Sequence, residues 1–225
     1  MGKRGYLDHA ENEIKDFLGE DVERVLFVPY ARPNGMTHNE YADIAEERFK
    51  KMGYGLDSIH EARNPIRAVR EAEAIFIGGG NTFVLLENLQ KRGLIPEIKK
   101  KIRKGIPYIG SSAGSNLAGP TIMTTNDMPI REIKSLKAFN IVPFQINPHF
   151  IDHDPKSKMN VESRATRLQE FHEFNETPVV GIREGSFIRL ADGKCKLRGT
   201  TGAVIFRKNK KPRECKANCS LDFLF

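Results

Sequence analysis

A chain of 225 residues, 39% of them hydrophobic, can bury a sizeable core in one large α/β domain or in two small ones. No apolar run approaches the roughly 18–20 residues that span a bilayer. The segment 1–6 lacks the apolar core of a signal peptide, so the sequence predicts a cytosolic protein without a membrane partner.

The net charge of +7 raises the question of nucleic-acid binding. In the first basic cluster, residues 97–105, isoleucines recur at helical spacing, so the lysines are expected on the solvent face of an amphipathic helix. The second cluster, residues 207–213, is expected to be a loop. Neither cluster is interleaved with aromatic residues. The charge therefore predicts mild attraction for acidic ligands and no nucleic-acid partner.

The chain has three cysteines, Cys195, Cys215 and Cys219. An odd number argues against a disulfide framework. The pair Cys215-x-x-x-Cys219 has no second ligand pair nearby, which argues against a zinc site. The sequence therefore predicts reduced thiols without a chemical role.

Apolar runs typical of strands alternate with helical periodicity. The predicted strands are 24–28, 55–59, 74–77, 106–109, 179–182, 187–190 and 203–206, and the predicted helices are 6–18, 39–52, 82–90, 95–104 and 161–171. Strands separated by helices favour parallel βαβ units, whereas the short strands of the final third favour an antiparallel edge. The sequence predicts a single α/β domain, residues 1–225, with a doubly wound, mostly parallel sheet, helices on both faces and an antiparallel C-terminal edge.

A triple glycine, Gly78 to Gly80, follows the predicted strand 74–77 and opens a helix. Such a loop can bind a phosphate. However, the Lys-[Ser/Thr] of a P-loop is missing, and Phe83 stands where a dinucleotide-binding loop has its third glycine. The other role of such a loop is to present backbone N–H groups to an oxyanion.

The pentapeptide 110–114 reads G-x-S-x-G between the predicted strand 106–109 and a segment that can open a helix. This is the context of a nucleophile elbow, so Ser112 is the candidate nucleophile. Elbow enzymes take one oxyanion donor from the N–H after the nucleophile and one from a separate glycine-rich loop, here Ala113 and Gly79. The alternative is a turn of small residues packed under a helix. The hydrolase interpretation is preferred because it uses both loops.

A serine nucleophile needs a base, and the base needs an orienting acid. His149 follows a proline after an apolar run, a rigid position that suits a general base, and His153 is its rival. For the acid, Glu184 directly follows the predicted strand 179–182, and Asp127 is the alternative. The residues alone leave these two carboxylates about equal.

Five segments together resemble peptidase E, the α-aspartyl dipeptidase family: 75–83 (IFIGGGNTF), 108–116 (YIGSSAGSN), 124–130 (TTNDMPI), 146–150 (INPHF) and 182–185 (IREG). The resemblance extends from residue 5 to about residue 206. It implies a fold like that of class I glutamine amidotransferases, with a Ser-His-Glu triad at Ser112, His149 and Glu184. It also implies hydrolysis of Asp-X dipeptides through an acyl-enzyme, without metal or organic cofactor, by a monomer or homodimer.

Two further residues are expected to bind the substrate. Asp127 is a candidate for the free ammonium, which an exopeptidase must recognise. Arg164 resembles an arginine that follows the histidine loop in peptidase E and is a candidate for the aspartate side chain, since a guanidinium pairs bidentately with a carboxylate. The alternative for Arg164 is a solvent-facing position on the predicted helix 161–171.

Family members usually begin with an apolar strand before the segment that resembles residues 5–9. Here only residues 1–4 precede that segment, so the first family strand is expected to be missing from the sheet. Two other functions stay open. One is a cyanophycinase-like serine hydrolase of β-aspartyl linkages. The other is a non-enzymatic binding module, if the missing strand disables the site.

Overall fold

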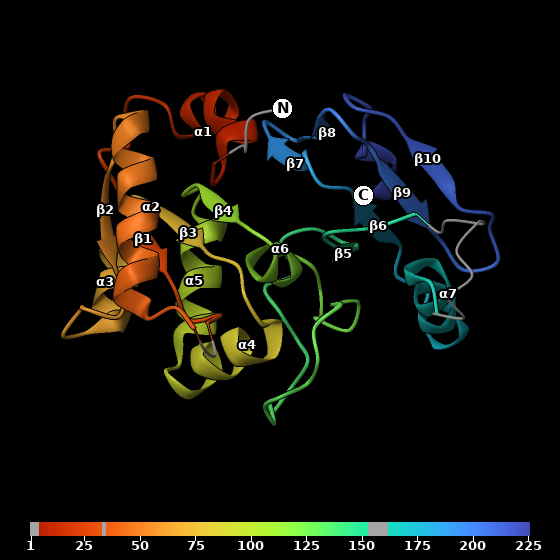
Figure 1. Cartoon of the computed structure of the whole chain (residues 1–225), viewed down its shortest axis with the longest axis horizontal. Coiled ribbons are helices and arrows are strands. Elements are labelled where there is room, and N and C mark those ends of the chain that lie inside the picture. Colours follow the sequence, from red (N-terminus) through yellow and green to blue (C-terminus); the bar gives the residue numbers. More distant parts are fainter. Residues whose placement is uncertain (1–4, 33–34, 153–161) are drawn as a thin grey trace.

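The computed structural model describes residues 5–32, 35–152 and 162–225, and its strands form two four-stranded sheets and a hairpin (Figure 1). The first sheet is parallel, in the order β2 (Gly55–Ser58), β1 (Arg24–Val28), β3 (Ala74–Ile77) and β4 (Tyr108–Gly110). The second has the order β10 (Arg213–Cys215), β9 (Ala203–Phe206), β6 (Val179–Ile182) and β5 (Gln145–Asn147). The hairpin consists of β7 (Ser186–Ala191) and β8 (Lys194–Gly199).

The predicted α/β fold with parallel strands and an antiparallel C-terminal part is confirmed. In the second sheet β5 and β6 are parallel, and the other pairs are antiparallel. The short helix α6 (Ala113–Ala118) lies between the two sheets and contacts both β4 and β5 (Figure 1). The first strand of the described residues is β1, and the residues before it form η1 (Asp8–Ala10) and α1 (Glu11–Leu18).

The first sheet is covered on both faces. Helices α1 and α2 (His38–Met52) cover one face, and α3 (Pro65–Glu71), α4 (Thr82–Lys91) and α5 (Leu94–Arg103) cover the other. Along β1, Leu26 and Val28 face the second group, while Val25 and Phe27 face the first. Both sides of the strand are therefore apolar, as in other doubly covered parallel sheets. None of the helices in the described ranges combines the length and apolarity that a membrane crossing requires.

The second sheet packs between α7 (Arg164–Phe174) and the hairpin β7–β8. Val179 and Val204 face α7, where Leu168 is buried against them. Val180 and Ile205 point to the other face, toward the hairpin and the C-terminal segment that ends in η2 (Asp222–Leu224). Both faces of this sheet are thus buried as well.

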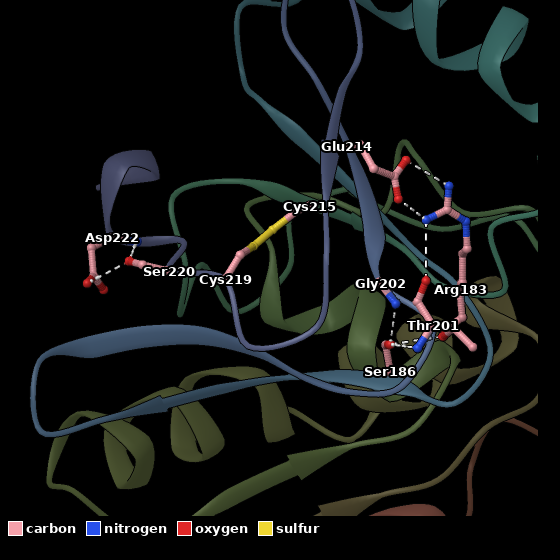
Figure 2. Close-up of a disulfide and its surroundings, with 9 residues drawn as sticks. All are labelled: Arg183, Ser186, Thr201, Gly202, Glu214, Cys215, Cys219, Ser220 and Asp222. Atoms are coloured by element: carbon pink, nitrogen blue, oxygen red, sulfur yellow. Dashed lines mark hydrogen bonds and ion pairs between the residues drawn. A yellow bond between two sulfur atoms is a disulfide. The ribbon is translucent and has the colours of Figure 1, made fainter.

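Cys215 and Cys219 form a disulfide at the end of β10 (Figure 2). The prediction that these two thiols are reduced is wrong, because the chain turns after β10 and pairs with β8. The N–H of Leu197 donates to the carbonyl of Cys219 at 3.0 Å, and the two cysteine Cα atoms lie 6.1 Å apart, a separation that a disulfide spans. Cys195 is free and buried, and burial raises the pKa of its thiol to about 12.

Candidate active site

The backbone at Ser112 has the conformation of a nucleophile elbow. Ser112 connects β4 to α6 with φ 50° and ψ −104°, a region that costs a non-glycine residue on the order of 1–3 kcal/mol. Its neighbours hold it there, because the N–H of Ser111 donates to the carbonyl of Ile77 at 3.0 Å and the N–H of Gly114 donates to Ser111 at 2.9 Å. A Cβ at Gly114 would lie 2.3 Å from the carbonyl oxygen of Ile77, so this turn requires a glycine.

The side chains of Ser112, His149 and Glu184 form one hydrogen-bonded chain. Nε2 of His149 lies 2.7 Å from Oγ of Ser112, and Nδ1 of the same ring is hydrogen-bonded to Oε1 of Glu184. The carboxylate therefore favours the tautomer with the proton on Nδ1, which leaves Nε2 free to accept the serine proton. The side chains of His149 and Glu184 are 48% and 76% exposed. Water thus screens the carboxylate charge and weakens its electrostatic effect on the ring.

The pairing of β5 with β6 brings the base and the acid together. These strands are parallel, with Asn147 opposite Gly181, so His149 and Glu184 emerge from neighbouring strand ends. His149 itself has a left-handed φ of 56°. The next N–H, that of Phe150, donates to the carbonyl of Ile182 at 2.8 Å and ties the histidine loop to the end of β6.

Polar side chains hold Glu184 in the tight turn between β6 and β7. The hydroxyl of Thr201 donates to the carbonyl of Glu184 at 2.6 Å. The hydroxyl of Ser186 accepts the N–H groups of Thr201 and Gly202 at 3.1 and 2.8 Å (Figure 2). The start of β9 is therefore attached to this turn, and the position of the carboxylate depends on both.

Arg183, the residue before Glu184, is bound by two carboxylates. Its guanidinium donates to Asp152 at 2.7 and 2.8 Å. It also donates to Glu214 at 2.5 and 3.0 Å (Figure 2). These hydrogen bonds raise the pKa of Arg183, and Arg183 lowers the pKa of Asp152. Since its donors are already engaged, Arg183 holds the turn and is not available to a substrate.

The two predicted oxyanion donors have different surroundings. Ala113 is the first residue of α6, so its N–H has no acceptor within the helix. Gly79 lies against the nucleophile, because a Cβ added there would be 3.0 Å from Cβ of Ser112. The N–H of Gly79, however, donates to the hydroxyl of Tyr41 at 2.7 Å. The N–H of the next residue, Gly80, has no acceptor among the described residues.

Asp127 lies at the N-terminus of α4 and not at the histidine ring. Its Oδ2 accepts the N–H and the hydroxyl of Thr82 at 2.8 and 2.6 Å and lies 3.1 Å from the hydroxyl of Thr125. The side-chain amide of Asn116, on α6, donates to the hydroxyl of Thr82 at 3.3 Å. Asp127 is therefore linked to the elbow helix through a polar network.

Arg164 is the first residue of α7, and its guanidinium is partly buried. Its Nη1 is buried and has no hydrogen-bond partner within the described part of the chain. Burial lowers the pKa of Arg164, repulsion from Arg167 adds to this, and attraction by Glu184 opposes it. Arg167, by contrast, pairs with Glu162 at 2.9 Å. A buried guanidinium without a partner is unfavourable unless an anion binds it.

Two predictions from the sequence concern residues that the structure does not describe. His153, the rival base, and the start of the predicted helix 161–171 lie outside the described residues. The contact of Tyr41 with Gly79 was not predicted, because helical periodicity marks a tyrosine as buried without indicating which loop it meets. No group of three His, Cys, Asp or Glu side chains within the described ranges is arranged to hold a metal ion.

A serine, a histidine and a carboxylate joined in this order on a strand–helix elbow are typical of serine hydrolases. The chain belongs to peptidase family S51, whose sequence model matches residues 1–198. A protein named peptidase E from Streptomyces coelicolor is 42% identical over 221 residues, which cover 98% of this chain and 89% of that protein. A protein named probable alpha-aspartyl dipeptidase from Drosophila melanogaster is 40% identical over 222 residues, which cover 98% and 91%. The resemblance to peptidase E is confirmed.

Two solved structures share the fold. A peptidase from an acI-B1 actinobacterium superposes with a TM-score of 0.69 at 18% identity, over 94% of this chain and 88% of that one. A putative peptidase E protein from Listeria monocytogenes superposes with a TM-score of 0.61 at 21% identity, over 95% and 96%. These similarities support the architecture of the two sheets and their helices.

Proposed function

We propose that this chain is a serine exopeptidase that hydrolyses dipeptides with an N-terminal aspartate, Asp-X. The observation that carries the proposal is the hydrogen-bonded chain from Ser112 through His149 to Glu184 on a strained elbow. The relatives named peptidase E and probable alpha-aspartyl dipeptidase support the reaction and the substrate class. On the basis of the sequence we also propose that the protein is cytosolic and is a monomer or a homodimer.

In the proposed first step, Oγ of Ser112 attacks the carbonyl carbon of the scissile bond while Nε2 of His149 takes the hydroxyl proton. Glu184 holds the Nδ1–H and stabilises the resulting imidazolium. His149 then protonates the leaving amine, and the aspartyl group stays on Ser112 as an ester. Water activated by His149 hydrolyses this acyl-enzyme. The steps require no metal or organic cofactor.

The tetrahedral oxyanion is proposed to accept the N–H groups of Ala113 and Gly79. Ala113 contributes a donor at the start of α6, beside the nucleophile. Gly79 contributes the second by exchanging the hydroxyl of Tyr41 for the oxyanion. This exchange is favourable because a charge-assisted hydrogen bond is about twice as strong as a neutral one.

Two side chains are proposed to recognise the aspartyl residue. Arg164 pairs with its side-chain carboxylate, which would satisfy the buried Nη1. Asp127 binds the free ammonium, because the side-chain hydrogen bonds that it makes with described residues use only Oδ2. Asparagine at the same place would leave the guanidinium unpaired, so Asn-X dipeptides should be poor substrates.

Hydrolysis of a panel of dipeptides by the purified protein tests this function. The panel contains Asp-Leu, Glu-Leu, Asn-Leu and β-Asp-Leu, and the control is the Ser112→Ala variant. The expected result is a strong preference for Asp-Leu in the parent and a loss of about 10³-fold or more in the variant. A preference for β-Asp-Leu would support the cyanophycinase-like function, and no hydrolysis by the parent would support a binding module.

A further inference from the structure

The segment after β1 brings an arginine next to the glycine loop that flanks Ser112. The carbonyl of Ala31 accepts the N–H of Asn81 at 2.7 Å, and a Cβ at Gly80 would lie 2.2 Å from this carbonyl oxygen. The backbone of Ala31 is thus in direct contact with the loop. Its neighbour Arg32 therefore leaves the chain beside the proposed oxyanion hole.

The side chain of Arg32 packs on Tyr41, the residue that binds the loop. Its guanidinium carbon is 4.4 Å from the centre of the Tyr41 ring. The hydroxyl of Tyr41 accepts the N–H of Gly79 at 2.7 Å and lies 2.8 Å from the hydroxyl of Tyr6. Gly79 in turn lies against the Cβ of Ser112. The cation–π contact therefore places the guanidinium within a cluster that borders the elbow.

No described carboxylate pairs with Arg32. Its Nε is buried and, across the ranges that the structure describes, has no hydrogen-bond partner. The ring of Tyr41 stabilises a cation by about 0.5–2 kcal/mol but offers it no acceptor. A guanidinium that is partly desolvated and lacks an anion is unfavourable, as for Arg164. Among the described residues, two arginines near the elbow thus each have a buried guanidinium nitrogen without a hydrogen-bond partner. Arg32 follows β1 of the first sheet and Arg164 begins α7, which packs on the second sheet, and α6 lies between the sheets (Figure 1).

A dipeptide Asp-X carries two carboxylates, one on each side of the scissile bond. The aspartate side chain belongs to the residue that is transferred to Ser112, and the C-terminal carboxylate belongs to the residue that leaves. We propose that Arg32 binds the C-terminal carboxylate of the leaving residue, opposite Arg164. Only a substrate that ends one residue after the scissile bond presents a carboxylate there, so this pairing selects dipeptides over longer chains. The inference rests on the proposed function.

The test compares Asp-Leu with its C-terminal amide, Asp-Leu-NH₂, in the parent and in Arg32→Met. The parent is expected to prefer the free carboxylate by about tenfold or more in kcat/KM, mainly through KM, as for one charge-assisted contact. Arg32→Met should bring this ratio close to one by losing activity on Asp-Leu while keeping its activity on the amide. Arg32→Lys should restore part of the preference. The matched control is Arg92→Met, since the guanidinium of Arg92 stacks 4.7 Å above Tyr30 in a similar cation–π contact. The control should keep the parent's ratio.

Three results would overturn the inference. They are equal activity of the parent on both substrates, an Arg32→Met ratio equal to the parent's, and an equal loss on both substrates in Arg32→Met. The last result would mean that Arg32 only supports the packing of Tyr41. Failure of the proposed function itself has a different signature, because the parent would then hydrolyse neither substrate or Ser112→Ala would hydrolyse both as the parent does. That signature would overturn both proposals.

Discussion

The backbone N–H of Gly79 donates a hydrogen bond of 2.7 Å to the hydroxyl of Tyr41, a residue that is 1% exposed. Gly79 also lies against the Cβ of Ser112. In the free protein the tyrosine hydroxyl therefore occupies a donor that the proposed mechanism assigns to the oxyanion. Removing this hydroxyl separates its effect on stability from its effect on catalysis. The N–H of Gly79 would then be unpaired in the free protein and paired only in the transition state.

Tyr41→Phe is expected to change stability and catalysis in opposite directions. The free energy of unfolding should fall by about 1–3 kcal/mol, because a buried N–H loses its acceptor. The kcat/KM for Asp-Leu should be retained or rise. Urea denaturation and steady-state kinetics measure the two quantities. The control is Tyr54→Phe, whose hydroxyl binds the carbonyls of Lys15 and Gly19 and should affect stability alone. A parallel loss of stability and kcat/KM in Tyr41→Phe would contradict the Gly79 assignment and favour Gly80 as the donor.

Glu184→Gln should lower kcat for Asp-Leu by at least about tenfold. Glutamine keeps an acceptor for the Nδ1–H of His149 but removes the charge that stabilises the imidazolium. The fall should be smaller than the roughly 10⁴-fold known for a buried triad acid, because the Glu184 side chain is 76% exposed.

Asp127→Asn should instead mainly raise KM, and an N-acetylated substrate should discriminate poorly between this variant and the parent. A larger loss of kcat in Asp127→Asn than in Glu184→Gln would show that the acid is misassigned.

The apolar pattern located strands made of apolar residues and missed β5, which is buried but mostly polar. The bounds of β1, β3, β6 and β9 agree with the prediction to the residue. The three-residue strand β5, Gln145–Asn147, has two polar side chains and was not predicted. Its pairing with β6 decides which carboxylate meets His149. Sequence reasoning from the residues alone therefore left Glu184 and Asp127 equal.

The division of the strands into two sheets and the disulfide Cys215–Cys219 depend on long-range pairing in the same way. The elbow, in contrast, could be predicted because a G-x-S-x-G pattern encodes its own backbone conformation. The observed φ of 50° at Ser112 agrees with that pattern. The environment of Arg164 could not be predicted, since its burial depends on how α7 packs against the second sheet.

Arg164→Met should remove most of the preference for aspartate. We expect a lower kcat/KM for Asp-Leu that corresponds to a loss of about 2–4 kcal/mol in transition-state stabilisation, the cost of a lost partner for a buried charge. The kcat/KM for Asn-Leu should fall far less. Arg167→Met is the matched control, because Arg167 lies one turn further along α7 and pairs with Glu162. If the ratio of kcat/KM for Asp-Leu to that for Asn-Leu is unchanged in Arg164→Met, Arg164 does not bind the aspartate side chain. If this ratio falls in Arg167→Met, Arg167 is the residue that binds it.

Asp152→Asn should lower stability in a pH-dependent manner. Hydrogen bonds from Arg183 hold the pKa of Asp152 below its ordinary value near 4. The contribution of this carboxylate to the free energy of unfolding is therefore fully present above the pKa of Asp152 in the unfolded state. It is lost as the pH falls through the pKa of Asp152 in the folded state. The free energy of unfolding should be lower in the variant by up to about 1 kcal/mol between pH 5 and 8, because Asp152 is 59% exposed. The difference should shrink below about pH 4, and a difference that grows on acidification would contradict this account.

The most direct test of the account is labelling of the protein with a fluorophosphonate, followed by peptide mass spectrometry. The parent should carry one adduct, on Ser112, because only an activated serine reacts. Ser111→Ala should label like the parent, His149→Ala should lose labelling, and His153→Ala should retain most of it. An adduct on another serine, an unlabelled parent, or a His149→Ala variant that reacts at the parent's rate would contradict the assignment of Ser112 and His149 as nucleophile and base.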